Sequence, residues 1–253
     1  MKIIQLKIFF FFFFIYVKGQ SQTTDSTVAT ITYKTVAYKD AKKVNSFYDI
    51  SILKIGKISS RFFSRNNLDN ESTIISIAKT NPFNGNIPML KPTFPQDVEK
   101  YYTQDNFVIV EQLMTGRYGV RFDTSYNQEW KIDTVSKFIG GLKCIKAETI
   151  FKNRKYIVFF APEIPITNGP WIFSGLPGLI LEAFDTDRLL SFSLEEIKWA
   201  NNSKEIFSLG YNYKLISKED FVLSKEKHKQ MSKEQKVQAI IEANPGFKVT
   251  PHQ

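Results

Sequence analysis

The chain has 253 residues, a formal net charge of +9, one cysteine and two histidines. A single cysteine cannot form an internal disulfide, so stability must come from a buried core, which a chain of this length can build. His228 and His252 lie near the C-terminus without the cysteine or acidic spacing of a metal site, so we expect no metal and no cofactor.

The N-terminus has the order of a secretory signal peptide. Lys2 and Lys7 precede the apolar residues 8–17, and the small and polar residues Gly19, Gln20 and Ser21 follow. The apolar block is about half of the ~20 residues that a spanning helix needs. We therefore predict a signal peptide over residues 1–19, a secreted or periplasmic location, and no membrane span after cleavage, with a retained anchor as the alternative.

Short runs of alternating or β-branched residues predict a series of strands. In residues 28–37, Ile31, Tyr33 and Thr35 alternate with more polar residues. The further predicted strands cover residues 46–55, 57–64, 107–114, 118–122, 128–132, 143–151, 156–161, 179–184, 189–197 and 206–215. Residues 65–96 interrupt the series with many asparagines and prolines, and they predict a long excursion over one face or edge.

The C-terminal part, residues 217–253, predicts a basic helical tail. Ser217 with Asp220 and Ser232 with Gln235 each fit an N-terminal capping box. No Gly, Ser or Pro linker divides the rest, so residues 20–216 form one predicted β domain. More than ten short strands predict a mainly β fold in which a curved antiparallel sheet resembles a half-barrel or bowl, followed by C-terminal helices. A β-sandwich is the alternative.

The most distinctive stretch is residues 169–185, GPWIFSGLPGLILEAFD. Glycines that allow positive φ and prolines that fix φ predict a shaped loop rather than a loose one. This stretch begins in the connection between two predicted strands, residues 162–178, which we call the signature connection. The apolar run from Leu179 predicts a buried strand.

The hexapeptide Gly175-Leu176-Pro177-Gly178-Leu179-Ile180 resembles the signature of the GLPGLI family, secreted proteins of Bacteroidetes with no assigned activity. Other segments resemble that family in the same order, and they are residues 31–34, 53–64, 130–132, 141–147, 162–165 and 169–170. One departure is that residues 158–161 lack the family's usual tryptophan. The resemblance implies a fold like the bowl-shaped N-terminal domain of a secreted bacterial peptide:N-glycanase or, more loosely, the half-barrels of periplasmic lipoprotein carriers, and it supplies no catalytic residue.

Residue patterns for known chemistry are weak. The chain has no nucleophile elbow, Walker loop or Rossmann glycine pattern, and Cys144 lies in a predicted strand, which favours a buried inert thiol over a reactive one. A carboxylate pair drawn from Glu163, Glu182, Asp185 and Asp187 would suffice for an extracellular hydrolase acting on glycans or peptides.

The predicted binding residues therefore lie in the signature stretch, and we assign no catalytic residue. They are Gly169, Pro170, Trp171, Phe173, Gly175, Leu176, Pro177, Gly178, Leu179 and Ile180. The aromatic side chains around them predict either a core or an apolar concavity for a lipid-like ligand. Three hypotheses follow. The first is a non-enzymatic domain that binds an apolar ligand or another envelope protein, and the second is the hydrolase. In the third the signature only closes the sheet, and the function lies in the excursion over residues 65–96. No nucleic-acid motif is present, so we expect no nucleic-acid partner.

Overall fold

The computed structural model describes residues 23–38, 42–43, 46–80, 90–113, 116–123, 128–200, 205–210 and 213–231. The predicted signal peptide and the predicted capping box at Ser232 lie outside these residues. The described elements are, in chain order, β1 (Thr23–Tyr38), β2 (Ser46–Gly56), β3 (Ser59–Ser64), α1 (Arg65–Thr80), β4 (Gln96–Tyr101), β5 (Asn106–Leu113), β6 (Gly116–Asp123), β7 (Lys131–Ile139), β8 (Leu142–Phe151), β9 (Arg154–Ala161), β10 (Leu179–Asp185), β11 (Leu190–Trp199), β12 (Ile206–Leu209), β13 (Lys214–Leu215) and α2 (Lys218–Gln230).

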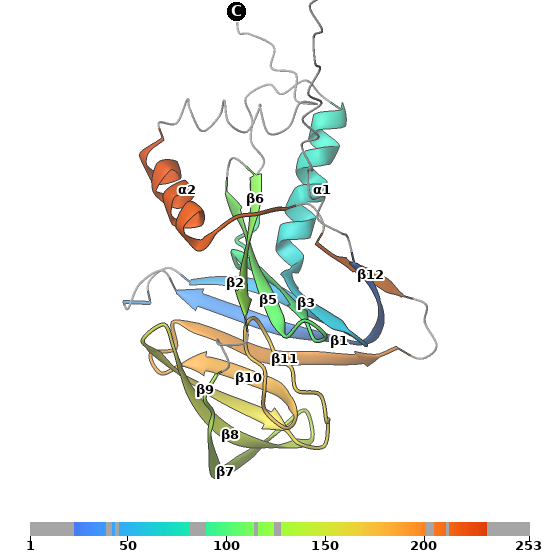
Figure 1. Ribbon diagram of the computed structural model, residues 1–253. Helices are drawn as coiled ribbons and strands as arrows, with labels where there is room; N and C mark the ends of the chain where they lie inside the picture. Colours follow the sequence, from blue (N-terminus) through green and yellow to red (C-terminus); the bar gives the residue numbers. More distant parts are fainter. Residues whose placement is uncertain are drawn as a thin grey trace, which may run out of the picture.

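The described strands form one open sheet (Figure 1). The order is β13-β6-β5-β4-β3-β2-β1-β11-β10-β9-β8-β7, with β12 paired to β1 off this path. All pairs are antiparallel except β13 with β6. The prediction of a mainly β, largely antiparallel protein is thus confirmed, and the strands lie in one sheet rather than in the two sheets of a sandwich.

The alternation in the first predicted strand is confirmed. Ile31, Tyr33 and Thr35 of β1 are fully buried, while the residues between them are more exposed. β1 lies near the middle of the sheet, where it pairs with β2 on one side and with β11 on the other. Its buried face belongs to the main apolar core, which also takes in β8, β9, β10 and the signature connection.

The prediction for residues 65–96 was wrong over residues 65–80, and its residues 81–89 lie outside the described part of the chain. The chain continues from β3 into the helix α1, and Ser64 caps its first turn by accepting a hydrogen bond from the Asn67 backbone N–H at 2.9 Å. β4, which carries several of the buried polar side chains described below, was missed altogether. The predicted strand 128–132 begins later and runs further, as β7, and residues 206–215 hold two short strands instead of one.

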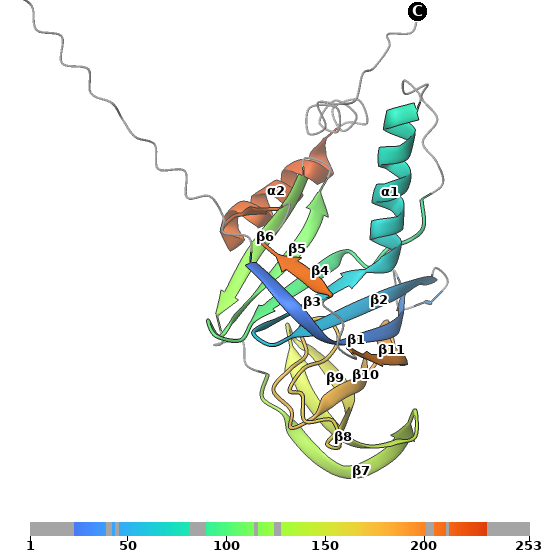
Figure 2. The same ribbon diagram turned by 90° about the vertical axis from the view of Figure 1, so that its right-hand side faces the viewer.

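The predicted cap of the tail is confirmed, because Ser217 Oγ accepts from the Asp220 backbone N–H at 3.0 Å and α2 follows. Figure 2 shows both helices at the end of the molecule away from β7 and β8, with α1 projecting beyond the sheet. Among the described helices, none is both long and apolar enough to cross a bilayer.

Candidate functional site

The signature connection is a folded segment with its own hydrogen bonds. The backbone N–H of Phe173 donates to Pro170 O at 3.1 Å, and that of Gly178 donates to Leu176 O at 2.8 Å. The connection is then tied to the start of β10, where the Ile180 N–H donates to Asn168 O at 2.9 Å. This geometry confirms the expectation of a shaped loop.

Most of the predicted binding residues are buried. Trp171 is 7% exposed, and Phe173, Leu176, Leu179 and Ile180 are at most 1% exposed. Gly169, Pro170 and Gly178 are also buried, whereas Gly175 and Pro177 are exposed. The apolar side chains of the signature therefore form part of the core, and only its turn reaches the surface.

Trp171 lies at the centre of an aromatic cluster. Its ring meets those of Phe94, Phe151 and Phe173 edge to face, with centroids 6.1, 5.7 and 5.6 Å away. Its indole N–H donates to Gln96 Oε1 at 2.7 Å, which satisfies the one polar atom of the side chain. The aromatic residues that suggested an apolar concavity thus fill the space between the sheet and the connection.

At two positions of the signature, the backbone geometry requires a glycine. A Cβ on Gly178 would lie 2.4 Å from the Ala161 carbonyl oxygen, so only glycine permits this close approach to the end of β9. Gly175 has a φ of +89°, in the left-handed region that side chains disfavour. Its turn lies beside the Trp130 indole, whose N–H donates to Ser174 O at 2.8 Å.

Lys100 of β4 fixes the connection from the side of the sheet. Its ammonium group donates to Asn168 Oδ1 at 2.8 Å, Gly169 O at 3.2 Å and Phe173 O at 2.7 Å. These three oxygens match the three N–H donors of an ammonium group. Burial lowers the pKa of Lys100 from 10.5 to about 7. No feature of the sequence around Lys100 indicated this role.

Further polar side chains complete the attachment of the connection. Gln128 donates through Nε2 to Ile172 O at 3.0 Å and accepts from the Ser174 N–H through Oε1 at 3.1 Å. The amide of Asn168 donates to Ser60 Oγ and to Tyr102 OH, both at 2.9 Å. The connection is therefore attached by polar groups to the β3–β4 region and to the segment before β7.

A pocket of about 300 Å³ opens where the connection meets the turn between β4 and β5. From the connection its lining includes Ile172, Ser174 and Gly175, and from the turn it includes Tyr102 and Asn106. Asn106 Oδ1 is buried and has no hydrogen-bond partner among the described residues. A buried carbonyl oxygen without a donor is uncommon in proteins, and it marks this pocket as a candidate binding site.

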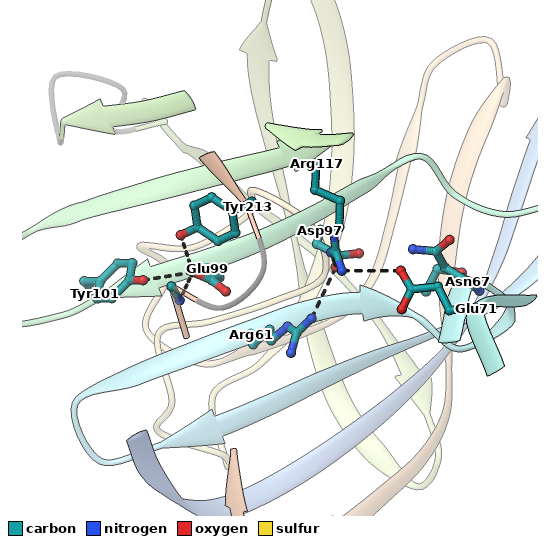
Figure 3. Close-up of polar contacts among 10 residues, drawn as sticks. Arg61, Asn67, Glu71, Asp97, Glu99, Tyr101, Arg117 and Tyr213 are labelled. Carbon is teal, nitrogen blue, oxygen red and sulfur yellow. Dashed lines mark hydrogen bonds and ion pairs between the residues drawn. The ribbon is translucent and has the colours of Figure 1, made fainter. Parts of the chain in front are cut away.

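The opposite face of β4 carries a second buried polar cluster (Figure 3). Asp97 accepts from Arg117 Nη2 at 2.5 Å and from Arg61 Nη2 at 3.5 Å. Glu99 Oε2 accepts from Tyr101 OH at 2.8 Å and from Tyr213 OH at 2.6 Å.

The Gly210 backbone N–H also donates to Glu99 Oε2, at 2.9 Å. Burial is the main reason that the pKa of Tyr213 is raised, and the Glu99 charge raises it further. Glu99 thereby holds the segment that leads to β13 and α2 against the sheet. Arg117 in the same cluster reaches α1, with its Nη1 3.5 Å from Glu71 Oε1.

The predicted carboxylates have separate partners. Glu182 forms an ion pair with Lys137, and Asp185 Oδ2 accepts from Arg154 Nη1 at 3.0 Å while its Oδ1 accepts from the Leu190 N–H at 2.9 Å. Glu163 and Asp187 are exposed. Asp185 thus stabilises the turn between β10 and β11, as turn aspartates do.

Cys144 is a free, fully buried thiol. Burial is the main cause that raises its pKa, to about 11, so the thiol is protonated at neutral pH. The interpretation of Cys144 as an inert core residue is therefore supported. Within the described residues, no group of three or more His, Cys, Asp or Glu side chains could hold a metal ion.

Two solved structures of PNGF-II, in the P21 and C2 space groups, resemble this fold. Both give a TM-score of 0.51, at 15% and 16% sequence identity, and they cover 79% and 82% of this chain. The chain spans 33% of the length of the PNGF-II chains. At this identity the similarity concerns the fold alone.

No curated protein matches the sequence. A family model described as "Protein of unknown function (Porph_ging)" matches residues 148–182. The matched segment runs from β8 through β9 and the signature connection into β10, so it contains the GLPGLI hexapeptide and confirms the resemblance to that family.

Proposed function

We propose that the chain is an exported, non-enzymatic β domain that binds a ligand in the pocket beside the signature connection. The observation that carries this proposal is Asn106 Oδ1, which lines a pocket of about 300 Å³ and is buried with no hydrogen-bond partner among the described residues. A group of this kind is stabilised when a bound molecule donates to it. The order of charged, apolar and small residues in the predicted signal peptide supports export.

In this proposal the signature acts mainly as a structural support. Its buried apolar residues hold the connection on the sheet, while Ile172, Ser174 and Gly175 form one wall of the pocket. The open sheet and the packing of the connection against one face support a curved, bowl-like form, in which the connection fills much of the concave side (Figure 2). The remaining space would lie at the turn between β4 and β5.

The hydrolase hypothesis has less support. Its main acid, Glu182, is ion-paired with Lys137, and Asp185 serves a turn. We therefore assign no catalytic residue. If Glu182→Gln abolished a hydrolytic activity while leaving the melting temperature unchanged, the hydrolase would replace the binding domain as the better explanation.

Native mass spectrometry of residues 20–253, purified from the periplasm of a related host, tests the proposal. We expect an adduct of small-molecule mass on the wild-type chain. Ser174→Trp should remove the adduct, because the larger side chain fills the pocket while the backbone bonds of Ser174 to Gln128 and Trp130 can remain. A polypeptide without any adduct would favour an envelope protein as the partner, and an adduct retained by Ser174→Trp would place binding elsewhere.

A further inference from the structure

We propose that the pocket beside the signature connection takes a neutral carbohydrate of one or two sugar rings. This inference rests on the proposed function and specifies its ligand class. It combines three properties of the lining: a buried hydrogen-bond acceptor without a partner among the described residues, a lysine whose donors are already used, and partly apolar walls.

The acceptors lie in the turn between β4 and β5. Within the part of the chain that the structure describes, Asn106 Oδ1 is buried without a hydrogen-bond partner. The Nδ2 group of the same side chain makes long contacts there, 3.4 Å to Gln104 O and 3.3 Å to Gln104 Oε1. The neighbouring Asp105 is exposed, has a φ of +50°, and forms no ion pair within the described part of the chain. The buried Asn106 Oδ1 therefore suits a ligand that donates hydrogen bonds, as hydroxyl groups do, and the exposed Asp105 carboxylate can accept further hydrogen bonds from it.

Charged ligands fit this lining poorly. Lys100 lines the pocket, but its three N–H donors are taken by Asn168, Gly169 and Phe173, so none is left for a carboxylate or phosphate. The Asp105 carboxylate would repel such an anion. Asp105 is the one acidic side chain among the described lining residues, and because it is exposed, a cation would gain little from it.

The remaining walls are partly apolar, and Gln128, Thr167 and Ser174 add polar groups to them. Tyr102 is 42% exposed, Phe107 is half-buried, and Ile172 closes the wall on the side of the connection. A lipid chain would use these walls but would leave Asn106 Oδ1 and Asp105 desolvated without donors, which is costly. A sugar ring has an apolar C–H face and a rim of hydroxyl donors, and so it matches both parts of the lining.

The volume agrees with this ligand class. A pocket of about 300 Å³ is at the lower end of the ~300–1,000 Å³ range of small-molecule sites. It suits a mono- or disaccharide and not a long polymer enclosed along its length.

Isothermal titration calorimetry of the mature chain tests the ligand class. The neutral probes are N-acetylglucosamine, maltose, cellobiose and lactose, and the contrasting probes are inorganic phosphate, choline and palmitate. We expect at least one neutral saccharide to bind. Asn106→Ala should weaken that binding about tenfold or more, because it removes the buried acceptor. Asp105→Asn should weaken it less, since asparagine tolerates the positive φ and keeps one acceptor oxygen.

Asn153→Gly is the matched control. Asn153 lies in the turn between β8 and β9 with a φ of +60°, which glycine adopts without strain, so saccharide affinity should not change. Melting temperatures of all variants show whether a loss of binding reflects unfolding, and Asp105→Asn provides a second test if Asn106→Ala does not fold.

Different results would contradict the proposed carbohydrate class and the proposed binding site. If phosphate, choline or palmitate binds and no saccharide binds up to about 10 mM, the carbohydrate class is wrong while the pocket remains a binding site. A saccharide that binds Asn106→Ala, Asp105→Asn and Ser174→Trp as tightly as the wild type overturns the assigned location. If no probe binds and the native chain carries no adduct, both proposals fail.

Discussion

Lys100 Nζ and Asn168 Oδ1 are joined by a hydrogen bond of 2.8 Å across 68 residues of sequence. The bond links β4 to the segment that carries the signature, and the Asn168 amide also donates to Tyr102 OH, whose side chain lines the pocket. The signature and the pocket are thus parts of one hydrogen-bonded arrangement, and changes to either should affect the other.

Trp171→Ala should reduce the free energy of unfolding by about 3–5 kcal/mol, because it leaves a cavity in the aromatic cluster and an unpaired Gln96 Oε1. Chemical denaturation measures this loss. Phe138→Ala is the control, since Phe138 is 74% exposed, and its effect should stay within about 0.5 kcal/mol. A Trp171→Ala protein of unchanged stability would contradict the structural role of the signature.

Gly178→Ala should destabilise the fold by about 1–3 kcal/mol, because the new Cβ would lie 2.4 Å from the Ala161 carbonyl oxygen and force the connection away from β9. Gly141→Ala is a useful comparison. Gly141 has a φ of +81° but no atom within 4 Å of the added Cβ, so only backbone strain of about 1 kcal/mol applies. If Gly178→Ala and Gly141→Ala lowered the melting temperature equally, the close approach to the Ala161 carbonyl would not explain the glycine at position 178.

Because of the titration of Lys100, the free energy of unfolding should rise between pH 7 and pH 9. Burial lowers its pKa in the folded protein from 10.5 to about 7, so in this window the unfolded chain binds more protons than the folded chain. The free energy of unfolding then increases with pH, by at most about 1.4 kcal/mol per pH unit. Below pH 7 both states are protonated, and the cost of burying the ammonium is present in full.

Lys100→Met removes this titration, so the free energy of unfolding, measured by urea denaturation at pH 7 and pH 9, should rise with pH in the wild type and rise less in the variant. The pKa of Cys144, raised from 9 to about 11, opposes the trend from about pH 8 upward, where the unfolded thiol begins to ionise, and this contribution is the same in Lys100→Met. Lys137→Met, a change at a partly exposed ion pair, serves as the control. A wild-type slope no steeper than that of Lys100→Met would contradict the depressed pKa.

Tyr213→Phe should loosen the attachment of α2 more than Tyr101→Phe does. Each change removes one hydroxyl donor from Glu99 Oε2 and should cost about 1 kcal/mol. Tyr213, however, immediately precedes β13 and α2, whereas Tyr101 belongs to β4 itself. Hydrogen–deuterium exchange should therefore accelerate in residues 218–230 for Tyr213→Phe. Faster exchange in that helix for Tyr101→Phe alone would contradict the proposed attachment.

The sequence predicts strands well where one face is apolar. β1 has such a face in Ile31 and Tyr33, and its prediction was confirmed. β4 was missed because only Val98 among its six residues is a typical core residue; Asp97, Glu99 and Lys100 are buried through contacts with partners far away in the chain. Strand propensity and hydrophobic periodicity describe neighbouring residues, so they do not predict contacts with distant parts of the chain.

The candidate site shows the same limit. Glycine and proline spacing indicates that residues 169–178 have a fixed shape, but not that their apolar side chains face the core. The pocket depends on Asn106 and Tyr102, which look like ordinary turn residues in the sequence. α1 was missed because its asparagines are poor helix formers, and the cap by Ser64 that begins it was not recognised.

The position of β1 has a consequence for how the protein folds. The strand β1 is fully paired only after β11, which lies more than 150 residues later in the sequence, has formed beside it, with Ile31 opposite Ile197. Contacts between such distant segments are slow to form, since a long loop must close before they contribute stability. During synthesis the first strand therefore lacks its second neighbour until almost the whole chain has emerged. The strands β1 to β6 can pair with their sequence neighbours before then, but the two halves of the sheet are joined only when β11 pairs with β1.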